Sequence, residues 1–214
     1  MLSHKFVIAP LSILIFLTSS CLVAGQMRRP GWCRADRDYV SIVNPSTFRG
    51  SWYVHSRYPF WYDENYRCCK IDYTPGIKNV HRVRNFQISN KDESVKVNTG
   101  TLTSLPDGEI EVKYDEPGAL TFNYNILTYC TEYVIIYACK NLDTVEHDEY
   151  LWIHTKDPKP PKHVIHAYEA ALEDEKISTS DLKLVRHEDC GKYETNQKSV
   201  AQQQSNSKGK SVCF

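Results

Sequence analysis

The sequence lacks several signatures that would assign a function directly. Lysine plus arginine and aspartate plus glutamate both number 26, so no net charge draws the chain toward nucleic acid or acidic membranes. No two cysteines have the C-x-x-C spacing of zinc sites. The sequence contains no internal repeat and no N-x-S/T acceptor, because Asn44 is followed by proline. We therefore expect no metal, no cofactor and no nucleic-acid partner, and a ligand recognised by its shape.

The chain also lacks an apolar run long enough to cross a membrane. The run at residues 6–17 has roughly a dozen residues, against the ~20 that a transmembrane helix needs. His4 and Lys5 precede it and small residues follow at 23–25, so residues 1–25 are predicted to be a secretory signal peptide. An uncleaved anchor and a lipid on Cys21 are the alternatives. The prediction is a secreted, extracellular protein without a transmembrane span.

Cysteine is the residue that the mature chain does have in quantity. Of the eight cysteines, Cys21 would leave with the signal and seven would remain. In an oxidising compartment these are expected to form disulfides, and an odd number leaves at least one unpaired or joined to another chain. Residues 26–190 are long enough for one domain. Residues 191–214 are polar and predicted to be a disordered tail.

Short segments rich in Val, Ile, Tyr, Phe and Thr fill the middle of the chain. Eight of them are candidate strands: 50–58, 68–74, 80–88, 94–105, 109–114, 119–127, 132–139 and 149–155. Pro, Gly, Asn and Asp separate them, as turns require. The pattern predicts an all-β fold, an eight-stranded up-and-down antiparallel barrel. Apolar residues at helical spacing in 162–176 predict one α-helix packed outside the barrel, followed by a short final strand at 182–187.

Three motifs in this order resemble the lipocalin family. They are Gly50-Ser51-Trp52 in the first strand, "YVIIYAC" ending at Cys139, and "LWIHTKDP" before the helix. The resemblance covers about residues 33–190. The placement of the cysteines is most similar to the branch of apolipoprotein D, Lazarillo and the insect bilin-binding proteins.

The resemblance assigns structural roles at the closed end of the barrel. It implies that Gly50 permits a tight entry into the first strand and that Trp52 plugs the barrel under a basic residue, here Lys156 where the family usually has arginine. The T-D-Y motif of the family falls on Thr128 and the two residues after it, so its aspartate and tyrosine are replaced. The hydrogen bonding of this end should therefore be unusual.

The family pattern also implies two disulfides. It pairs Cys33 with Cys139 and Cys68 with Cys190. Adjacent strand residues face opposite sides of a sheet, so Cys69 should point into the barrel near its mouth. Cys69 is interpreted as a small buried apolar residue, and a bond to Cys213 is the alternative.

The strand pleat, taken from Trp52 and Cys69, predicts the lining of the interior. The expected ligand-binding residues are Val54, Ser56, Cys69, Ile71, Tyr73, Val83, Asn85, Asn98, Ile110, Val112, Tyr114, Asn123, Asn125, Val134, Ile136, Trp152 and His154. This set mixes apolar groups with four asparagines, two tyrosines and one histidine, so it suits a small hydrophobic or amphiphilic molecule. The resemblance permits a bilin or heme, a retinoid, a sterol or a fatty acid. His154 is interpreted as a hydrogen-bonded residue, with heme ligation or a carboxylate partner as alternatives.

Four aromatic residues follow the first strand. Tyr58, Phe60, Trp61 and Tyr62 fall in the connection at the barrel mouth. They are interpreted as a lid over the ligand. The alternative is a hydrophobic lip that makes peripheral membrane or receptor contact.

These observations predict a carrier of a small lipophilic molecule, with no catalytic residues. The enzyme alternative is a thiol isomerase of the prostaglandin D synthase type, in which Cys69 would be the nucleophile. Arg67 and Lys70 are expected to point elsewhere, so the sequence identifies no group that activates this thiol. A third alternative is an interaction or inhibitor protein like the lipocalins of blood-feeding arthropods.

Overall fold

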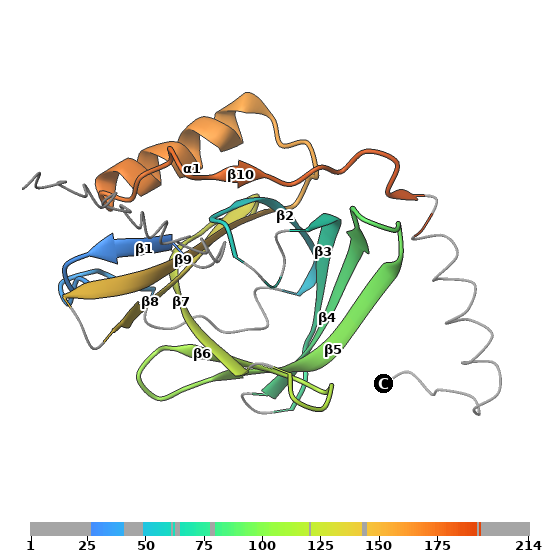
Figure 1. Cartoon of the computed structure of the whole chain (residues 1–214), viewed down its shortest axis with the longest axis horizontal. Helices are drawn as coiled ribbons and strands as arrows, with labels where there is room; N and C mark the ends of the chain where they lie inside the picture. Colours follow the sequence, from blue (N-terminus) through green and yellow to red (C-terminus); the bar gives the residue numbers. More distant parts are fainter. Residues whose placement is uncertain are drawn as a thin grey trace, which may run out of the picture.

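The frame of the molecule is a closed antiparallel barrel (Figure 1). The computed structural model describes residues 27–40, 49–60, 62, 65–77, 80–119, 121–142, 145–191 and 193. The barrel strands are β2 (Gly50–Arg57), β3 (Tyr66–Thr74), β4 (Val80–Ser89), β5 (Val95–Ser104), β6 (Ile110–Tyr114), β7 (Thr121–Tyr129), β8 (Tyr133–Asn141) and β9 (Glu146–Thr155). Each pairs with the next, and β9 pairs with β2 to close the ring. The predicted eight-stranded up-and-down barrel is confirmed.

Three further elements surround the barrel. Helix α1 (Lys162–Asp174) packs outside it and buries Val164, Tyr168 and Leu172, as its helical spacing predicts. Strand β10 (Lys183–Leu184) follows the helix and pairs with β2. Strand β1 (Met27–Pro30), which the sequence pattern does not predict, pairs with the first half of β9. Within the described residues, no helix has the length and apolar character that crossing a membrane requires.

Apolar side chains form two main layers, one on each side of the barrel wall. The inner layer contains Trp52, Leu102 and Ile136 and runs through the interior. The outer layer lies between the wall and α1, where Ile135 and Ile153 of the neighbouring strands β8 and β9 meet the helix. Strands that are buried on both faces explain why β8 reads as a continuous apolar run rather than as an alternation.

A seam interrupts the barrel between β2 and β3. The two strands pair only from Gly50 opposite Tyr73 to Tyr53 opposite Lys70. Beyond Tyr53, β2 pairs with β10 instead, and the backbone N–H of Cys68 donates to the carbonyl of Arg186 at 2.8 Å. The C-terminal segment therefore covers the place where β2 and β3 separate.

The closed end has the arrangement that the resemblance implies for Gly50, Trp52 and Lys156. Gly50 has a φ of +89°, a left-handed conformation that glycine adopts without strain. Trp52 is fully buried, and the ammonium nitrogen of Lys156 lies 3.7 Å from the centre of its ring. Tyr129, next to Thr128, packs against the indole with ring centres 6.3 Å apart. An aromatic ring thus occupies the region where the motif has changed.

Two disulfides tie distant segments together, and they are the pairs that the resemblance implies. Cys33 is bonded to Cys139 and Cys68 to Cys190, over sequence separations of 106 and 122 residues. Among the described cysteines, the buried Cys69 and the partly buried Cys130 form no disulfide. The predicted signal peptide, nearly all of the predicted tail, and Cys213 lie outside the described residues.

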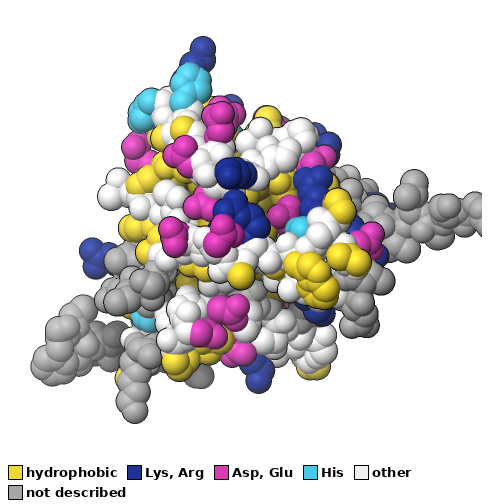
Figure 2. Space-filling model, turned by 90° about the vertical axis from the view of Figure 1, so that its left-hand side faces the viewer, with side chains coloured by type: hydrophobic (Ala, Val, Ile, Leu, Met, Phe, Trp, Pro, Cys, Tyr) yellow, Lys and Arg dark blue, Asp and Glu magenta, His cyan; other side chains and the backbone are white. Residues whose placement is uncertain are grey.

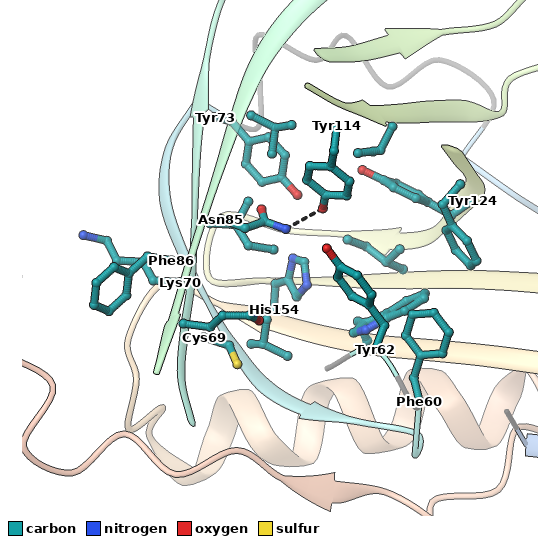
Figure 3. A pocket seen from close by; sticks show the side chains of 18 residues that line it. Phe60, Tyr62, Cys69, Lys70, Tyr73, Asn85, Phe86, Tyr114, Tyr124 and His154 are labelled. Carbon is teal, nitrogen blue, oxygen red and sulfur yellow. Dashed lines mark hydrogen bonds between the residues drawn. The ribbon is translucent and has the colours of Figure 1, made fainter. Parts of the chain in front are cut away.

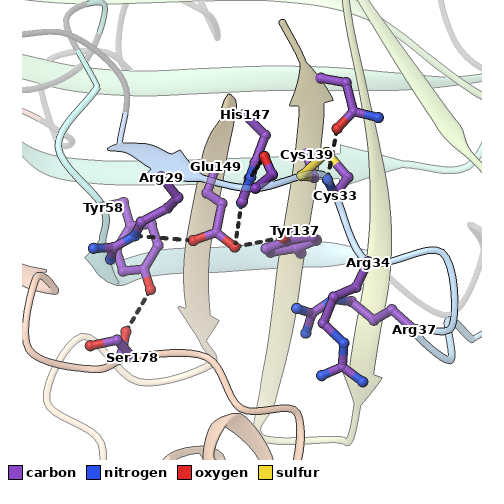
Figure 4. A network of polar contacts seen from close by, with 12 residues as sticks. Arg29, Cys33, Arg34, Arg37, Tyr58, Tyr137, Cys139, His147, Glu149 and Ser178 are labelled. Atoms are coloured by element: carbon purple, nitrogen blue, oxygen red, sulfur yellow. Dashed lines mark hydrogen bonds and ion pairs between the residues drawn. A yellow bond between two sulfur atoms is a disulfide. The ribbon is translucent and has the colours of Figure 1, made fainter. Parts of the chain in front are cut away.

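A polar network holds the N-terminal segment against β9 (Figure 4). Arg29 forms ion pairs with Glu149 at 3.4 Å and with Asp181 at 2.7 Å. Glu149 also accepts a hydrogen bond from the hydroxyl of Tyr137 at 2.8 Å, and the guanidinium of Arg37 lies over the same tyrosine ring at 4.6 Å. Figure 2 shows acidic and basic side chains interspersed on one face of the molecule. This face carries no large patch of one sign.

Candidate ligand-binding site

The barrel encloses a cavity of about 120 Å³, which we call the calyx (Figure 3). Its lining comes from the β2–β3 connection and from every barrel strand except β5: Val54, Phe60, Tyr62, Cys69, Lys70, Ile71, Tyr73, Val83, Asn85, Phe86, Gln87, Val112, Tyr114, Phe122, Tyr124, Ile136, Trp152 and His154. Lys70 and Phe86 are drawn beyond the wall, with side chains pointing away from the cavity. Most of the remaining side chains are aromatic or aliphatic, so the calyx is mainly apolar with a few polar groups.

Eleven of the seventeen residues predicted from the strand pleat line the calyx. They are Val54, Cys69, Ile71, Tyr73, Val83, Asn85, Val112, Tyr114, Ile136, Trp152 and His154. Their contact with a ligand remains a prediction. Phe122 and Tyr124 also line the cavity but are absent from the predicted set.

Three predicted residues are buried near the cavity without lining it. Ile110 and Val134 belong to the inner apolar layer that also contains Trp52. Asn98 is buried, and its amide forms a hydrogen bond of 2.6 Å with the hydroxyl of Tyr62. Asn98, which lies opposite Asn85 on the inner face, thus supports a lining residue.

Ser56 lies on the other side of the wall from the one predicted. Val54 pairs with His154, but Ser56 pairs with Ile153, so His55 is an extra residue in a β-bulge. A bulge reverses the faces of all later residues in the strand. Ser56 consequently shares the outer face with Ile153, and the prediction that it points inward is wrong.

The two predicted asparagines of β7 also have the opposite orientation. Phe122 and Tyr124 point into the barrel, so Asn123 and Asn125, which alternate with them, point outward. Asn123 is exposed and donates to a carboxylate oxygen of Glu109 at 3.1 Å. The prediction shifted this strand by one residue, which exchanges its two faces. The apolar side chains at 122, 124 and 126 were the signal that identifies the inner face.

Polar groups of four strands meet in the middle of the calyx (Figure 3). The amide of Asn85 donates a hydrogen bond to the hydroxyl of Tyr114. Burial raises the pKa of Tyr73, an effect that a hydrogen bond with Tyr124 partly offsets. Burial likewise raises the pKa of Tyr124 well above 10. These phenols stay protonated at physiological pH and offer neutral hydrogen-bonding groups to a guest.

Two polar atoms in this lining lack a hydrogen-bond partner within the described part of the chain. They are the amide oxygen of Asn85 and Nδ1 of His154, both fully shielded from solvent. Burial lowers the pKa of His154 from 6.5 to about 3, so its imidazole is neutral at physiological pH. A buried polar atom without a partner costs ~1 to 3 kcal/mol. A guest that bonds to these atoms would recover that cost.

The β2–β3 connection closes the mouth of the calyx. Phe60 packs edge-on against Tyr150 and Trp152, with ring centres 5.4 Å and 5.9 Å apart. Tyr62 is held by its bond to Asn98 and by the ammonium group of Lys96, 4.6 Å from its ring centre. Both aromatic residues therefore occupy the position predicted for a lid.

Tyr58, at the end of β2, does not belong to the lid. It is buried in the outer layer, and its hydroxyl donates to the carbonyl of Ser178 at 2.5 Å. Trp61 lies outside the described residues.

The calyx thiol has a neighbour that the sequence did not reveal. Nη1 of Arg57 lies 3.7 Å from Sγ of Cys69, and Nη2 of the same guanidinium donates to the carbonyl of Tyr66 at 3.4 Å. Arg57 is only 5% exposed. The bulge at His55 changes the direction of Arg57, so alternation along β2 could not have predicted this contact. In the part of the chain that the structure describes, no three His, Cys, Asp or Glu side chains are grouped as metal ligands would be.

Comparisons with known proteins identify relatives of the fold. No protein-family model matches the chain, and no curated protein matches its sequence. Among solved structures, insecticyanin from the tobacco hornworm Manduca sexta superimposes with a TM-score of 0.70 and 20% identity, over 77% of this chain and 91% of that one. H1 crustacyanin from the lobster Homarus americanus superimposes with a TM-score of 0.64 and 17% identity, over 80% of this chain and 96% of that one. The cockroach allergen Per a 4 superimposes with a TM-score of 0.61 and 19% identity, over 76% of this chain and 99% of that one. The chain has the lipocalin fold.

Proposed function

We propose that the protein is a secreted lipocalin that binds and carries a small amphiphilic molecule in its calyx, without catalysis. The observation that carries this proposal is the composition of the cavity. An apolar lining surrounds Asn85 and His154, whose buried amide oxygen and ring Nδ1 have no partner within the described residues. An apolar guest would leave both atoms unsatisfied. A guest with an N–H or O–H group satisfies them.

The calyx is too small for most lipophilic ligands unless its lining side chains move. A dry cavity of about 150 Å³ holds one benzene ring, and the calyx has about 120 Å³. Ligands of the size of a retinoid need several hundred Å³. Phe60 and Tyr62 must therefore swing outward when such a ligand enters. Tyr62 is held by hydrogen bonds with Asn98 and with the half-buried Lys96, contacts that a polar guest can replace.

Bilins, retinoids bearing a hydroxyl group, sterols and fatty acids all combine an apolar body with a hydrogen-bond donor. They are the ligand classes of the proposal. Two disulfides fit an oxidising compartment, which supports secretion. The cysteine pairs also support a place in the branch of apolipoprotein D and the insect bilin-binding proteins.

The proposal is tested by titrating the purified protein with retinol, cholesterol, palmitic acid and biliverdin while recording tryptophan fluorescence. Trp152 lines the calyx, so a bound ligand should quench it, and Trp152→Phe should remove that part of the signal. Native mass spectrometry of the secreted protein identifies any ligand acquired during expression. If none of the four classes saturates and no ligand is co-purified, the carrier proposal fails.

A paired substitution tests the role of the two unpartnered polar atoms. Retinol should bind about tenfold more tightly than its hydrocarbon analogue, because only retinol has a donor. The double variant Asn85→Leu, His154→Leu should lose this preference while it still binds the hydrocarbon. Asn123→Leu, on the outer face of β7, is the matched control and should keep the preference.

A thiol isomerase is the second candidate function, and the contact between Arg57 and Cys69 favours it. A guanidinium beside a thiol stabilises the thiolate, which is the nucleophilic form. Incubation with prostaglandin H2 followed by product analysis would detect the activity. Cys69→Ser should abolish it, whereas Cys130→Ser should not.

A further inference from the structure

The calyx contains a nucleophile that a carrier does not need. Cys69 lines the cavity, is 5% exposed and forms no disulfide. Cys130, the other described cysteine outside a disulfide, packs in the outer layer and is not part of the calyx lining. Among the described cysteines, a guest of the calyx therefore meets Cys69 alone.

The backbone of β3 fixes the position of this thiol. The pairing of β3 with β4 changes register between Arg67 and Lys70, so β3 has a bulge that contains Cys68 and Cys69. Within it, Cys68 has a φ of +54° and is bonded to Cys190 on the outer side of the wall. The disulfide therefore holds the backbone on which the inward-facing Cys69 is carried.

The surroundings of the thiol suit the hydrocarbon part of a guest. Cys69 is buried together with Val54 of β2 and Val185 of the C-terminal segment. The indole of Trp152 packs against the same cluster. Because ligand pockets are lined mainly by such side chains, an alkyl chain bound here would lie beside the sulfur.

A cation lies next to the sulfur. Nη1 of Arg57 is 3.7 Å from Sγ of Cys69, while Nη2 of the same guanidinium donates to the carbonyl of Tyr66. A guanidinium at this distance stabilises the thiolate, which is the nucleophilic form of cysteine. This effect depends on the contact itself, and it coexists with the other interactions of Arg57.

Polar groups of the same cavity require a guest that also has hydrogen-bonding groups. The amide oxygen of Asn85 and Nδ1 of His154 are buried in the calyx without a partner among the described residues. Asn85 donates its amide hydrogen to Tyr114, so its oxygen needs a donor such as a hydroxyl group. The N–H of a neutral imidazole and the lining phenols can donate to a carbonyl oxygen.

We propose that the calyx captures lipid-derived, hydroxylated α,β-unsaturated aldehydes and ketones as covalent adducts of Cys69. The inference rests on the proposed carrier function and names a ligand class for the same cavity. Such molecules combine an apolar chain, a hydroxyl donor, a carbonyl acceptor and an electrophilic carbon. Capture is a single addition, whereas an isomerase must release its product and regenerate the thiol.

The addition needs no further reactant. The thiolate sulfur attacks the β-carbon and forms a C–S bond, while the electron pair of the C=C bond moves to the carbonyl oxygen and gives an enolate. A proton then returns to the α-carbon. The sum is the addition of S–H across the double bond, with nothing oxidised or reduced. A hydrogen bond from the lining to the carbonyl oxygen stabilises the enolate.

The experiment is incubation of the full-length secreted protein with hydroxynonenal, followed by intact mass measurement and peptide mapping. The adduct at Cys69 should form about tenfold faster than at Cys130, because binding holds the electrophile beside the sulfur. Its rate should level off as the concentration of hydroxynonenal rises. An excess of nonanal, which has the chain but not the double bond, should slow it and form no thioether.

Matched variants assign the reaction to the calyx. Cys69→Ala should lose the fast adduct and Cys130→Ala should keep it, and retinol titration by fluorescence checks that the calyx is intact in both. Retinol binding without a faster adduct at Cys69 overturns the capture and leaves the carrier function standing. A rate that rises linearly and is not slowed by nonanal shows reactivity without binding, and also overturns it. Failure of the carrier function appears separately, as the absence of quenching by the four carrier ligands.

Discussion

Arg57 and Cys69 meet at the seam between β2 and β3, with Nη1 3.7 Å from Sγ. Cys69 lines the calyx, and Arg57 lines a second hollow of about 100 Å³ at this seam, so the contact joins the two hollows. The two residues are twelve positions apart on strands that do not pair at this point. The bulge in β2 and the separation of β3 bring them together.

This contact predicts how fast the calyx thiol reacts. Arg57→Gln should slow the alkylation of Cys69 by iodoacetamide several-fold, because the thiolate loses an adjacent positive charge. Peptide mapping by mass spectrometry separates Cys69 from the other thiols. Arg67→Gln removes another cation near the start of β3, which pairs with Glu93, and it should leave the rate nearly unchanged. Equal rates in the wild type and Arg57→Gln would contradict the activating role.

The two disulfides should each contribute substantially to stability. In the chain-entropy model a link that closes a loop of more than a hundred residues stabilises by about 4 kcal/mol. Urea unfolding of Cys68→Ser with Cys190→Ser, and of Cys33→Ser with Cys139→Ser, should show losses of this order. Cys130→Ser removes a free thiol and is the control. Losses no larger than that of the control would argue against the model.

His154 should make the protein sensitive to acid. Its pKa lies near 3 when folded because burial disfavours the imidazolium, against 6.5 when unfolded. Below pH 6.5 the unfolded state binds a proton at this residue that the folded state does not. The free energy of unfolding therefore decreases by up to about 1.4 kcal/mol for each unit by which the pH is lowered. His154→Gln should lose this component between pH 6.5 and pH 4 in urea unfolding.

The difference in the free energy of unfolding between the wild type and His154→Gln separates the contribution of this residue from that of the carboxylates, which also titrate in acid. The difference should be constant above pH 7 and shrink as the pH falls. His166→Gln, at an exposed position of α1, is the control and should run parallel to the wild type. A difference that does not depend on pH would contradict the buried neutral histidine.

Lys156 should stabilise the closed end through the indole of Trp52. Lys156→Met should lower the free energy of unfolding by about 1 kcal/mol, because it removes the cation over the indole ring. Lys156→Arg should be at least as stable as the wild type, since a planar guanidinium stacks on an indole. Urea unfolding followed by fluorescence measures both. Lys159→Met, an exposed lysine nearby, should have no effect, and an equal loss there would rule out a specific contact.

The fold was predictable because it follows from patterns that are local in the chain. Apolar residues with a period of two, and turns rich in Gly, Pro, Asn and Asp, define the eight strands. Helical spacing in 162–176 predicts α1, and its apolar side is the one that packs. Strand β1 was missed because its residues, "MRRP", carry no apolar alternation. Its pairing depends on β9, which is far away in the sequence.

The sequence determined which strands exist and that a barrel with a mixed lining should result, because periodicity is a property of consecutive residues. Only the tertiary structure decided which face of some strands points inward. The bulge at His55 turns Ser56 outward and moves Arg57 toward Cys69, and bulges arise from pairing between strands. The pairing of β10 with β2 likewise brings the C-terminal segment over the seam beside Arg57. The pairings of β2 with β9 and with β10 join residues about a hundred or more positions apart in the sequence, which no local pattern records.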